Sequence, residues 1–361
     1  MSGPKSDTAV ILFNLGGPTA PDTVKPFLFN LFNDRAIIGA PQPVRWLLAK
    51  LIAGRRAPVA RDIYAHLGGK SPIHEETDAQ AAALEAALRD RLGPSGAPSV
   101  HVVMRYWGRR AEAVARDLAG RGGVRRTILL PLYPQFSTTT SASSVREWRR
   151  WAAKTGLGPA AGGVCCYPAN RGFVAAMADR IAETLAGHDG DPPRILFSAH
   201  GLPEKVIAAG DPYRWQVERT AAALAEALDE TLAGTAADSV VCYQSRVGPL
   251  KWIGPSTEDE IRSAGAEGKP VLVAPVAFVS EHSETLVELD IEYRKVAEAA
   301  GVPAYLRAPT VGTHPAFIGG LADMVQAVLD RGGLDSGSGG RLCPGAWRAC
   351  PLAAPAAPGA A

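Results

Sequence analysis

Long apolar runs are absent from this sequence. No stretch approaches the roughly 18–20 consecutive apolar residues that a membrane-spanning helix requires. Near the N-terminus only Ala9–Phe13 forms a short apolar segment. That segment is too brief for the core of a signal peptide and predicts a first β-strand instead. We therefore expect a soluble, cytoplasmic protein.

An excess of charge of either sign is also missing. The 38 Lys and Arg residues nearly balance the 36 Asp and Glu residues, and no dense basic cluster stands out, which argues against a nucleic-acid partner. Cysteine is scarce, and in a reducing cytosol the five cysteines are not expected to form disulfides. Apolar residues make up 47% of the chain, which excludes wholesale disorder, and 361 residues suffice for about two domains.

Short β-rich apolar runs alternate with longer amphipathic segments, the pattern of βαβ units and parallel sheets. The expected strands are Val10–Leu15, Val100–Met104, Thr127–Tyr133, Gly163–Tyr167, Arg194–Ala199, Ser239–Gln244, Pro270–Phe278 and Pro303–Arg307. The expected helices are Thr77–Leu92, Arg110–Leu118, Val145–Ala153, Gly172–Ala186, Tyr213–Leu232, Glu284–Ala300 and Pro315–Asp330. The fold class is therefore α/β.

Glycine and proline mark the expected boundaries. The segment TGLGPAAGG, from Thr155, predicts the break between two domains. TILLPLYPQFSTTTSASS and PVLVAPVAFVSEHSETL are both apolar runs that reach a Phe and then a Ser before a helix, which suggests two similar lobes. After Arg331 the composition becomes Gly/Ser-rich and then Ala/Pro-rich, which predicts a flexible tail.

Two expected strands end at residues suited to metal and proton chemistry. RILFSAHGLP reaches His200, and KPVLVAPVAFVSEHSETL leads into Glu281, His282 and Glu284. Ligands of open α/β sheets bind outside the carboxyl ends of the strands, so we expect these side chains to face one another across a cleft. Histidine with carboxylates binds divalent transition metals and transfers protons. A lone histidine is more often a buried structural residue, but the Gly and Pro that follow His200 favour a functional turn.

Acidic residues recur along the expected helix after this strand. Glu284, Glu288 and Glu292 are spaced i, i+4, i+8, and Glu281 lies one turn earlier. Like charges at this spacing destabilise a helix by a few tenths of a kcal/mol per pair. A solvated acidic face is the ordinary explanation, but only Lys295 is spaced to neutralise the column. The pattern therefore favours the passage of a cation or of protons.

The stretch from Pro41 to Pro58 combines apolar and basic residues. Its apolar stripe and flanks consist of Val44, Leu47, Leu48 and Leu51 with Trp46 and Ile52, and its cations are Arg45, Lys50, Arg55 and Arg56. An ordinary surface helix packed on its own core explains this pattern. A hydrophobic lip for an apolar, anionic ligand or for a membrane surface explains it equally well.

Three further features are weaker. NLGGP, from Asn14, has too few glycines for a dinucleotide fingerprint and lacks the Gly-Lys-Ser/Thr of a P-loop, so it suits the close approach of a flat ligand better than a nucleotide. The hydroxyl cluster STTTSASS, from Ser137, exceeds what a helix cap needs, so we expect it to bind something else. Cys165, Cys166, Cys343 and Cys350 are explained as ordinary free thiols or as four thiol ligands of an iron–sulfur cluster, and their spacing fits no strong cluster motif.

The motifs taken together resemble the ferrochelatase family. The similarity runs in order from about Val10 to Asp330 and includes NLGGP, AGRRAP, IYAHLGGKSPI, MRYW, LYPQFSTTTSASS, FSAHGLP, GDPY, CYQSRVGPLKWIGPST and FVSEHSETLVELDIEY. The resemblance implies two similar Rossmann-like lobes, residues 1–154 and 155–312, with a chelatase-like active-site cleft between them. It also implies that a helix over 313–331 packs back on the first lobe, ahead of the tail over 332–361.

The resemblance also implies residue roles. His200 takes the place of the family's active-site histidine, and Glu284 that of its partner carboxylate, both as catalytic residues and metal ligands. The residues at the positions proposed to carry metal or protons are Glu281, His282, Glu288 and Glu292. The residues at positions around the porphyrin and its propionates are Leu15, Arg55, Arg56, Tyr64, Ser71, Arg105, Tyr106 and Trp252.

Two positions depart from the pattern of some relatives. Leu15 replaces a Tyr or Met that could ligate metal, and its apolar side chain favours protoporphyrin over coproporphyrin. Thr138 stands where animal enzymes place a cluster cysteine. A 2Fe–2S cluster in this chain would therefore need another arrangement, such as Cys165 or Cys166 with Cys343 and Cys350.

The activity implied is the insertion of ferrous iron into protoporphyrin IX to form protohaem, the terminal step of haem biosynthesis, with the release of two protons. Ferrous iron and the porphyrin are the substrates, and no cofactor is required. A peripheral contact with the inner membrane, or with the preceding oxidase of porphyrin synthesis, is a further expectation. The alternatives are a chelatase that loads cobalt or nickel into another tetrapyrrole, and a non-catalytic porphyrin carrier, which would not need the acidic column.

Overall fold

The computed structural model describes residues 6–232, 238–246 and 250–353 of the chain, which form two parallel sheets flanked by helices. In the first sheet the strand order is β2-β1-β3-β4-β9. Its strands are β1 Thr8–Asn14, β2 Ser99–Met104, β3 Arg126–Pro131, β4 Gly162–Val164 and β9 Gly333–Asp335. In the second sheet the order is β6-β5-β7-β8. Its strands are β5 Arg194–His200, β6 Ser239–Gln244, β7 Val271–Pro275 and β8 Tyr305–Arg307.

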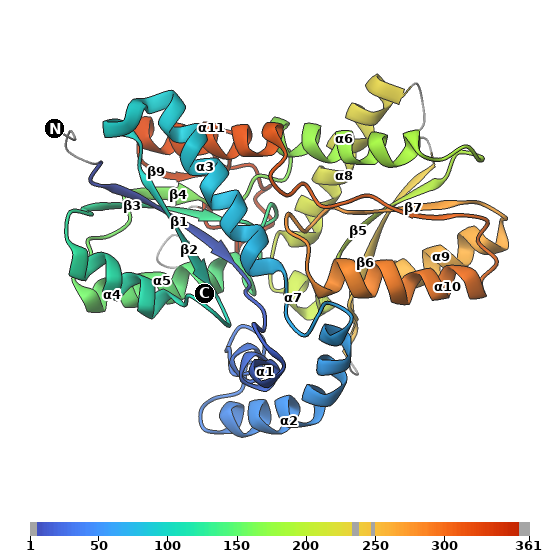
Figure 1. Cartoon of the computed structure of the whole chain (residues 1–361), viewed down its shortest axis with the longest axis horizontal. Helices are drawn as coiled ribbons and strands as arrows, with labels where there is room; N and C mark the ends of the chain where they lie inside the picture. Colours follow the sequence, from blue (N-terminus) through green and yellow to red (C-terminus); the bar gives the residue numbers. More distant parts are fainter. Residues whose placement is uncertain (1–5, 233–237, 247–249, 354–361) are drawn as a thin grey trace.

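Helices cover both faces of the sheets, which confirms the expected α/β class (Figure 1). The helices are η1 Pro21–Thr23, α1 Val24–Phe32, α2 Val44–Ala65, α3 Ile73–Gly96, α4 Ala111–Arg121, α5 Ser141–Thr155, α6 Arg171–Ala186, α7 Glu204–Ala208, α8 Tyr213–Leu232, α9 Thr257–Ala266, η3 Glu284–Glu292, α10 Tyr293–Ala299 and α11 Pro315–Arg331. Every residue of β1, TAVILFN, is buried, as a central parallel strand with helices on both faces requires. In the described part of the chain no helix is long and apolar enough to span a membrane.

One continuous core joins the two lobes. Val10 of β1 and Ile195 of β5 belong to the same buried cluster, which α6, α8 and α11 complete. Two fully buried glutamines cross between the lobes. Gln80 of α3 donates to the carbonyls of Val279 (2.6 Å) and Gly312 (2.9 Å). Gln135 donates to the carbonyl of Val276 (3.0 Å). These bonds fix the carboxyl ends of both sheets relative to one another.

The boundary expected at residue 155 lies too early. β4 pairs with β3 and with β9, so the first sheet continues to Val164, and the chain passes into the second lobe only afterwards. Helix α11 packs against α3 of the first lobe and also against α6 (Figure 1). Gly172 of α6 and Gly320 of α11 have no side chains, and this permits the close crossing of the two helices.

The expected flexible tail differs from the structure over residues 333–353. β9 is the last strand of the first sheet, and the amide of Cys165 donates to the carbonyl of Asp335 (2.8 Å). Cys343 and Cys350 are buried, and the Ala349 amide bonds the Gly210 carbonyl at 3.1 Å. Composition misled the prediction because a short strand and two buried thiols hold an otherwise Gly/Ser-rich segment. Residues 354–361 lie outside the described part.

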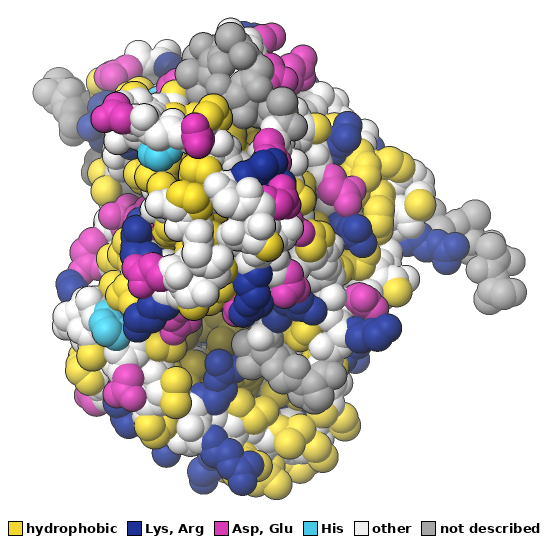
Figure 2. Space-filling view, turned by 90° about the vertical axis from the view of Figure 1, so that its right-hand side faces the viewer, with side chains coloured by type: hydrophobic (Ala, Val, Ile, Leu, Met, Phe, Trp, Pro, Cys, Tyr) yellow, Lys and Arg dark blue, Asp and Glu magenta, His cyan; other side chains and the backbone are white. Residues whose placement is uncertain are grey.

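Helices α1 and α2 form a unit that projects from the two lobes (Figure 1). The face of α2 that packs on this unit consists of small residues, Ala49, Ala53 and Ala57, followed by Tyr64. The large apolar side chains face outward instead: Val44, Trp46, Leu47, Leu48, Leu51 and Val59 are 37–63% exposed. An ordinary surface helix buries its large apolar residues, so the structure favours the alternative of a hydrophobic lip. Figure 2 shows hydrophobic and basic surface together at this end, with a hollow above it.

Candidate active site

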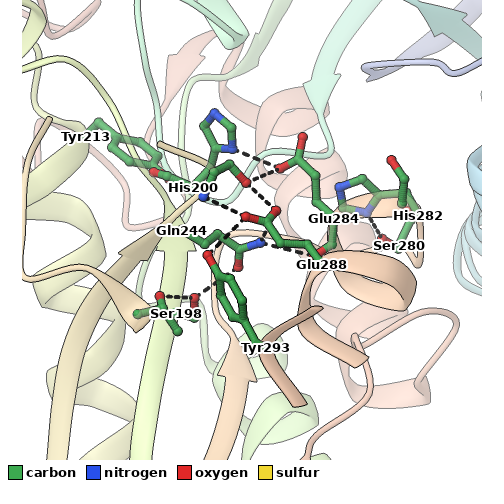
Figure 3. A network of polar contacts seen from close by, with 12 residues as sticks. Ser198, His200, Tyr213, Gln244, Ser280, His282, Glu284, Glu288 and Tyr293 are labelled. Carbon is green, nitrogen blue, oxygen red and sulfur yellow. Dashed lines mark hydrogen bonds and ion pairs between the residues drawn. The ribbon is translucent and has the colours of Figure 1, made fainter. Parts of the chain in front are cut away.

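The site is centred on His200 and Glu284, which the sequence predicted to meet. His200 is the last residue of β5, an inner strand of the second sheet, and Glu284 begins the helix that follows the β7 loop. The His200 Nδ1–H donates to Glu284 Oε2 at 2.8 Å. The two side chains are 37% and 28% exposed, so a ligand can reach both. Figure 3 shows the imidazole and the carboxylate pointing toward one another.

The helix that carries Glu284 is a π-helix over Glu284–Glu292, and it becomes α-helical only at Tyr293. The sequence predicted a regular α-helix with the glutamates stacked every fourth residue. A π-helix has a wider turn, so the regular column does not extend to Glu292. Such segments occur frequently at functional sites. Glu284 and Glu288 both turn toward the end of β6, whereas Glu292 is exposed.

Glu288 is held by four donors to its carboxylate. The Ser245 amide (2.8 Å) and the Tyr293 hydroxyl (3.0 Å) donate to Oε1, and the Ser245 hydroxyl (2.5 Å) and Gln244 Nε2 (3.1 Å) donate to Oε2. Ser245 adopts a φ of 61°, a left-handed conformation that is uncommon for a residue with a side chain. Its amide bond to Glu288 helps to stabilise this strained turn. Glu288 thus fixes the loop after β6 next to His200 and Glu284.

The charges of the site favour an ionised pair. Burial opposes protonation of His200, but the charge and hydrogen bond of Glu284 outweigh it, so the pKa of His200 is raised above 6.5. Burial would raise the pKa of Glu284, yet the charge and hydrogen bond of His200 lower it to about 2. For Glu288, burial and the neighbouring charge of Glu284 raise the pKa. The pKa values of the Glu284 and Glu288 carboxyls, about one helical turn apart, are therefore shifted in opposite directions.

Glu281 and His282 lie on the far side of the loop from His200. Glu281 accepts from Arg307 Nη1 (2.7 Å) and from the Thr310 amide (2.8 Å), and this pairing, with a lowered pKa despite burial, makes it an anchored carboxylate. His282 is buried, bonds the Ser280 carbonyl through Nδ1 (3.0 Å), and has its ring 4.6 Å from that of Phe278. Phe278 also contacts His200 edge-on.

A family model described as Ferrochelatase matches residues 7–329. The ferrochelatases of Phenylobacterium zucineum and Caulobacter vibrioides are 52% and 51% identical to this chain, over 95% of its length and over 97% and 96% of theirs. The chain belongs to the ferrochelatase family. The reaction of this family is the insertion of ferrous iron into protoporphyrin IX, the terminal step of haem biosynthesis, and the expected family and activity are confirmed. Among solved structures, the sirohydrochlorin chelatase SirB from Bacillus subtilis subspecies spizizenii, in complex with cobalt, shows a TM-score of 0.48 at 12% identity over 90% of this chain and 95% of that one, a similarity too weak to bear on function.

Two residues expected around the ferrochelatase substrate lie beside His200 and Glu284. Tyr64, at the end of α2, is buried and reaches Ser283 (3.4 Å), and burial raises its pKa to about 12, with Glu284 contributing. Trp252 packs against the backbone of Gly201, the residue after His200, and its buried indole N–H has no partner within the described residues.

Arg105 and Tyr106 occupy a buried network at the base of the α1–α2 unit. Asp34 accepts from Arg105 Nη2 (2.8 Å), the Tyr106 hydroxyl (2.9 Å) and the Ser143 hydroxyl (2.5 Å). Arg105 also binds Glu147 (3.0 Å), so two carboxylates already neutralise its charge. The positive charge of Arg105 lowers the pKa of Asp34, against the effect of burial. Asp34 was not predicted, because its partners are distant in the sequence.

The other porphyrin-site candidates lie near α2. Arg55 and Arg56 are exposed on it, Leu15 packs against the core of its unit, and Ser71 is buried against Gly17 of the NLGGP turn. The hydroxyl cluster STTTSASS, from Ser137, makes hydrogen bonds within the protein instead. Asp211 accepts from the Ser137 hydroxyl (3.0 Å) and from the amide and hydroxyl of Thr138 (2.7 Å each).

The four candidate cluster cysteines converge between β4 and the segment after β9. The Cys165 and Cys166 sulfurs lie 3.4 Å apart. The hydrogen bond with Cys165, burial, and the nearby Cys343 and Cys350 all raise the pKa of Cys166. Burial raises the pKa of Cys343 to about 12, and Cys350 and Cys165 act in the same direction. In the described part of the chain no three His, Cys, Asp or Glu side chains are arranged to hold a single metal ion.

Proposed function

We propose that His200 and Glu284 carry out the metal-insertion step of the ferrochelatase reaction. The observation that carries this proposal is their 2.8 Å contact at the carboxyl end of β5, in a position that a ligand can reach. Imidazole and carboxylate together suit ferrous iron, the metal substrate.

The proposed division of labour follows from the charges. Both pyrrole N–H protons must leave as iron enters, and His200 accepts a proton in those molecules whose imidazole is neutral. His200 is paired with an anionic Glu284, so proton uptake leaves an imidazolium that the carboxylate stabilises. Glu284 receives the incoming cation and passes the proton on. Binding of the porphyrin edges at Tyr64, Trp252 and the α2 unit would hold the ring for the reaction.

We extend the proposal to a route along the π-helix. Glu288 follows Glu284 at the end of β6, its raised pKa suits it to take up a proton, and the exposed Glu292 provides an outlet to solvent. His282 supports the route from beside Phe278. Glu281 acts as an anchor in this scheme, since Arg307 already binds it.

The test is anaerobic turnover of protoporphyrin and ferrous iron by the His200→Ala variant. We expect insertion to fall by about 10²-fold or more, the usual contribution of a general base, while porphyrin binding, followed by fluorescence, is retained. The matched control is His188→Ala, which removes a partly exposed histidine outside the site. Near-normal turnover of His200→Ala would contradict the assignment, and stoichiometric quenching without turnover by the unsubstituted protein would leave a porphyrin carrier.

We propose contacts to the substrate for the remaining candidates according to their exposure. Arg55 and Arg56 are exposed on α2 and suit the porphyrin carboxylates. Leu15 lies in the NLGGP turn and Ser71 packs against Gly17 of the same turn, so both would contact the porphyrin from this turn. Arg105 and Tyr106 act through the shape of the α1–α2 unit, since Asp34 and Glu147 already bind Arg105. The preference for protoporphyrin over coproporphyrin, which carries more carboxylates, follows from the apolar Leu15.

We also propose that Cys165, Cys166, Cys343 and Cys350 bind a 2Fe–2S cluster. Such a cluster takes four thiolates, two on each iron, and the structure supplies four buried sulfurs with Cys165 and Cys166 forming one close pair. The test is iron and labile sulfide content of anaerobically purified protein. We expect about two of each per chain, lost in Cys343→Ser and retained in Cys242→Ser, which alters a fifth buried cysteine in the second sheet. Absence of sulfide from the unsubstituted protein would overturn the proposal.

We further propose that the outward face of α2 rests on the cytoplasmic side of an anionic membrane. Its exposed Trp46, Leu47 and Leu51 lie on the helix that also carries the exposed Arg55 and Arg56, the combination of an interfacial helix. Vesicles with anionic lipid should bind the protein, and Leu47→Glu with Leu51→Glu should abolish binding. The control, Ala113→Glu with Gly120→Glu on α4, makes the same charge change elsewhere. Equal binding of both variants would contradict this orientation and leave the preceding oxidase as the expected partner of α2.

A further inference from the structure

Gln216 is a buried side chain that the substrate site does not use. It lies in the first turns of α8 and is fully shielded from solvent. Its amide nitrogen Nε2 donates to Cys343 Sγ at 3.1 Å, which falls within the range for a hydrogen bond to sulfur. Neither the helical pattern of α8 nor the catalytic pair requires a polar residue there, so this contact calls for another explanation.

The direction of the Gln216 amide is fixed by a second contact. The backbone amide of Phe136 donates to Gln216 Oε1 at 2.7 Å. A backbone N–H can only donate, so the oxygen of the carboxamide must face Phe136, and the NH₂ group must face the thiol. A buried carboxamide held in this way is a pre-oriented donor toward Cys343.

The surroundings hold this donor in place. The loop that contains Phe136 is hydrogen-bonded to Asp211, which lies two residues before α8 begins at Tyr213. Asp211 accepts from Ser137 and Thr138 of this loop. The segment that carries Cys343 is attached to the same place, since the Ala349 amide bonds the Gly210 carbonyl at 3.1 Å. Donor and sulfur therefore lie between two backbone segments that are bonded to the same short loop.

We infer that Gln216 is a positioning residue that stabilises the reduced state of the iron–sulfur cluster through a hydrogen bond to the Cys343 sulfur. This inference rests on the proposed cluster. Reduction adds negative charge that is shared with the ligand sulfurs, and a donor aimed at one of them stabilises that charge more in a buried site than in water. Gln216 thus raises the reduction potential of the cluster.

The experiment measures the reduction potential of the intact, anaerobically purified protein by dithionite titration with mediators, followed by visible absorbance and electron paramagnetic resonance. Gln216→Met removes the donor and fills the same space. Gln216→Glu keeps the acceptor for the Phe136 amide and replaces the donor with a second oxygen. We expect both variants to hold as much iron and sulfide as the unsubstituted protein and to shift to a more negative potential, with the larger shift for Gln216→Glu.

The matched control is Gln135→Met. Gln135 is equally buried and neighbours the same loop, but its amide donates to Thr220 and Val276 rather than to a thiol. Its substitution should leave the potential unchanged. An unchanged potential in both Gln216 variants at full cluster content would overturn the inference alone, as would an equal shift in Gln135→Met. Absence of a cluster from the unsubstituted protein would refute the proposed cluster, and the inference with it.

Discussion

At the scale of single residues, the site shows how partners decide the behaviour of one side-chain type. Glu284 and Glu288 are both partly buried glutamates on the same π-helix. The pKa of Glu284 is lowered by a cationic His200, whereas that of Glu288 is raised by burial and by Glu284. The sequence predicted that His200 and Glu284 would meet, because both follow buried strands. It could not predict Gln244, Ser245 and Tyr293 as partners of Glu288, since nothing in their local pattern indicates a contact with it.

The pairing predicts a change in the titration of His200. In the substrate-free protein the anion of Glu284 favours the imidazolium and raises the pKa of His200, so Glu284→Gln should lower it. His200 would then become neutral at a lower pH. Titration of its ring protons by nuclear magnetic resonance measures this directly, and His188 serves as the internal control. An unchanged or higher pKa of His200 in Glu284→Gln would contradict the ion pair.

At the scale of helices and strands, the alternation of apolar runs predicted most of the structure. All eight expected strands have counterparts, because buried parallel strands are continuous apolar runs. The π-helix was missed, since its local composition is that of an α-helix. For α2, the apolar stripe was predicted, but the sequence did not decide whether this stripe faces the core or the solvent. Only the tertiary structure shows that the alanine side is buried and the leucine side exposed.

The crossing of α6 and α11 predicts a strong effect of one added methyl group. A Cβ atom at Gly172 would collide with the backbone carbonyl of Ala316, which cannot move without displacing α11. Gly172→Ala should therefore lower the free energy of unfolding by roughly 1–3 kcal/mol, as overpacking does. Gly120→Ala on α4 meets no neighbour and should raise it by about 0.5–1 kcal/mol. Urea unfolding followed by circular dichroism compares the two, and a neutral Gly172→Ala would contradict the tight crossing.

At the scale of the whole molecule, the two lobes share a continuous buried core. The sequence predicted two similar lobes but placed their boundary before β4 and described the last thirty residues by composition alone. The strand near Gly163 was expected but was assigned to the second lobe, whereas it pairs with β3 of the first sheet. The strand β9 was missed because its three residues are too few for an apolar pattern. Short strands depend on their neighbours in the sheet, and the sequence does not show those neighbours.

The lobe contact made by Gln80 predicts a loss of global stability. Gln80→Met removes the donor to the Gly312 carbonyl and the acceptor for the Ser280 hydroxyl, at a cost of roughly 1–3 kcal/mol. Because the core is continuous, we expect both lobes to unfold in one transition before and after the change. Tryptophan fluorescence and far-ultraviolet circular dichroism in urea should give coincident curves. Separate transitions in the unsubstituted protein would contradict a shared core.

The position of β9 has a consequence for synthesis on the ribosome. This strand completes the first sheet beside β4, yet it is translated after the whole second lobe. While the nascent chain grows, β4 therefore presents an unpaired edge, and such edges favour association with other chains. The first lobe cannot finish folding cotranslationally as a unit, so its open edge has to be protected until the strand at Gly333–Asp335 has emerged.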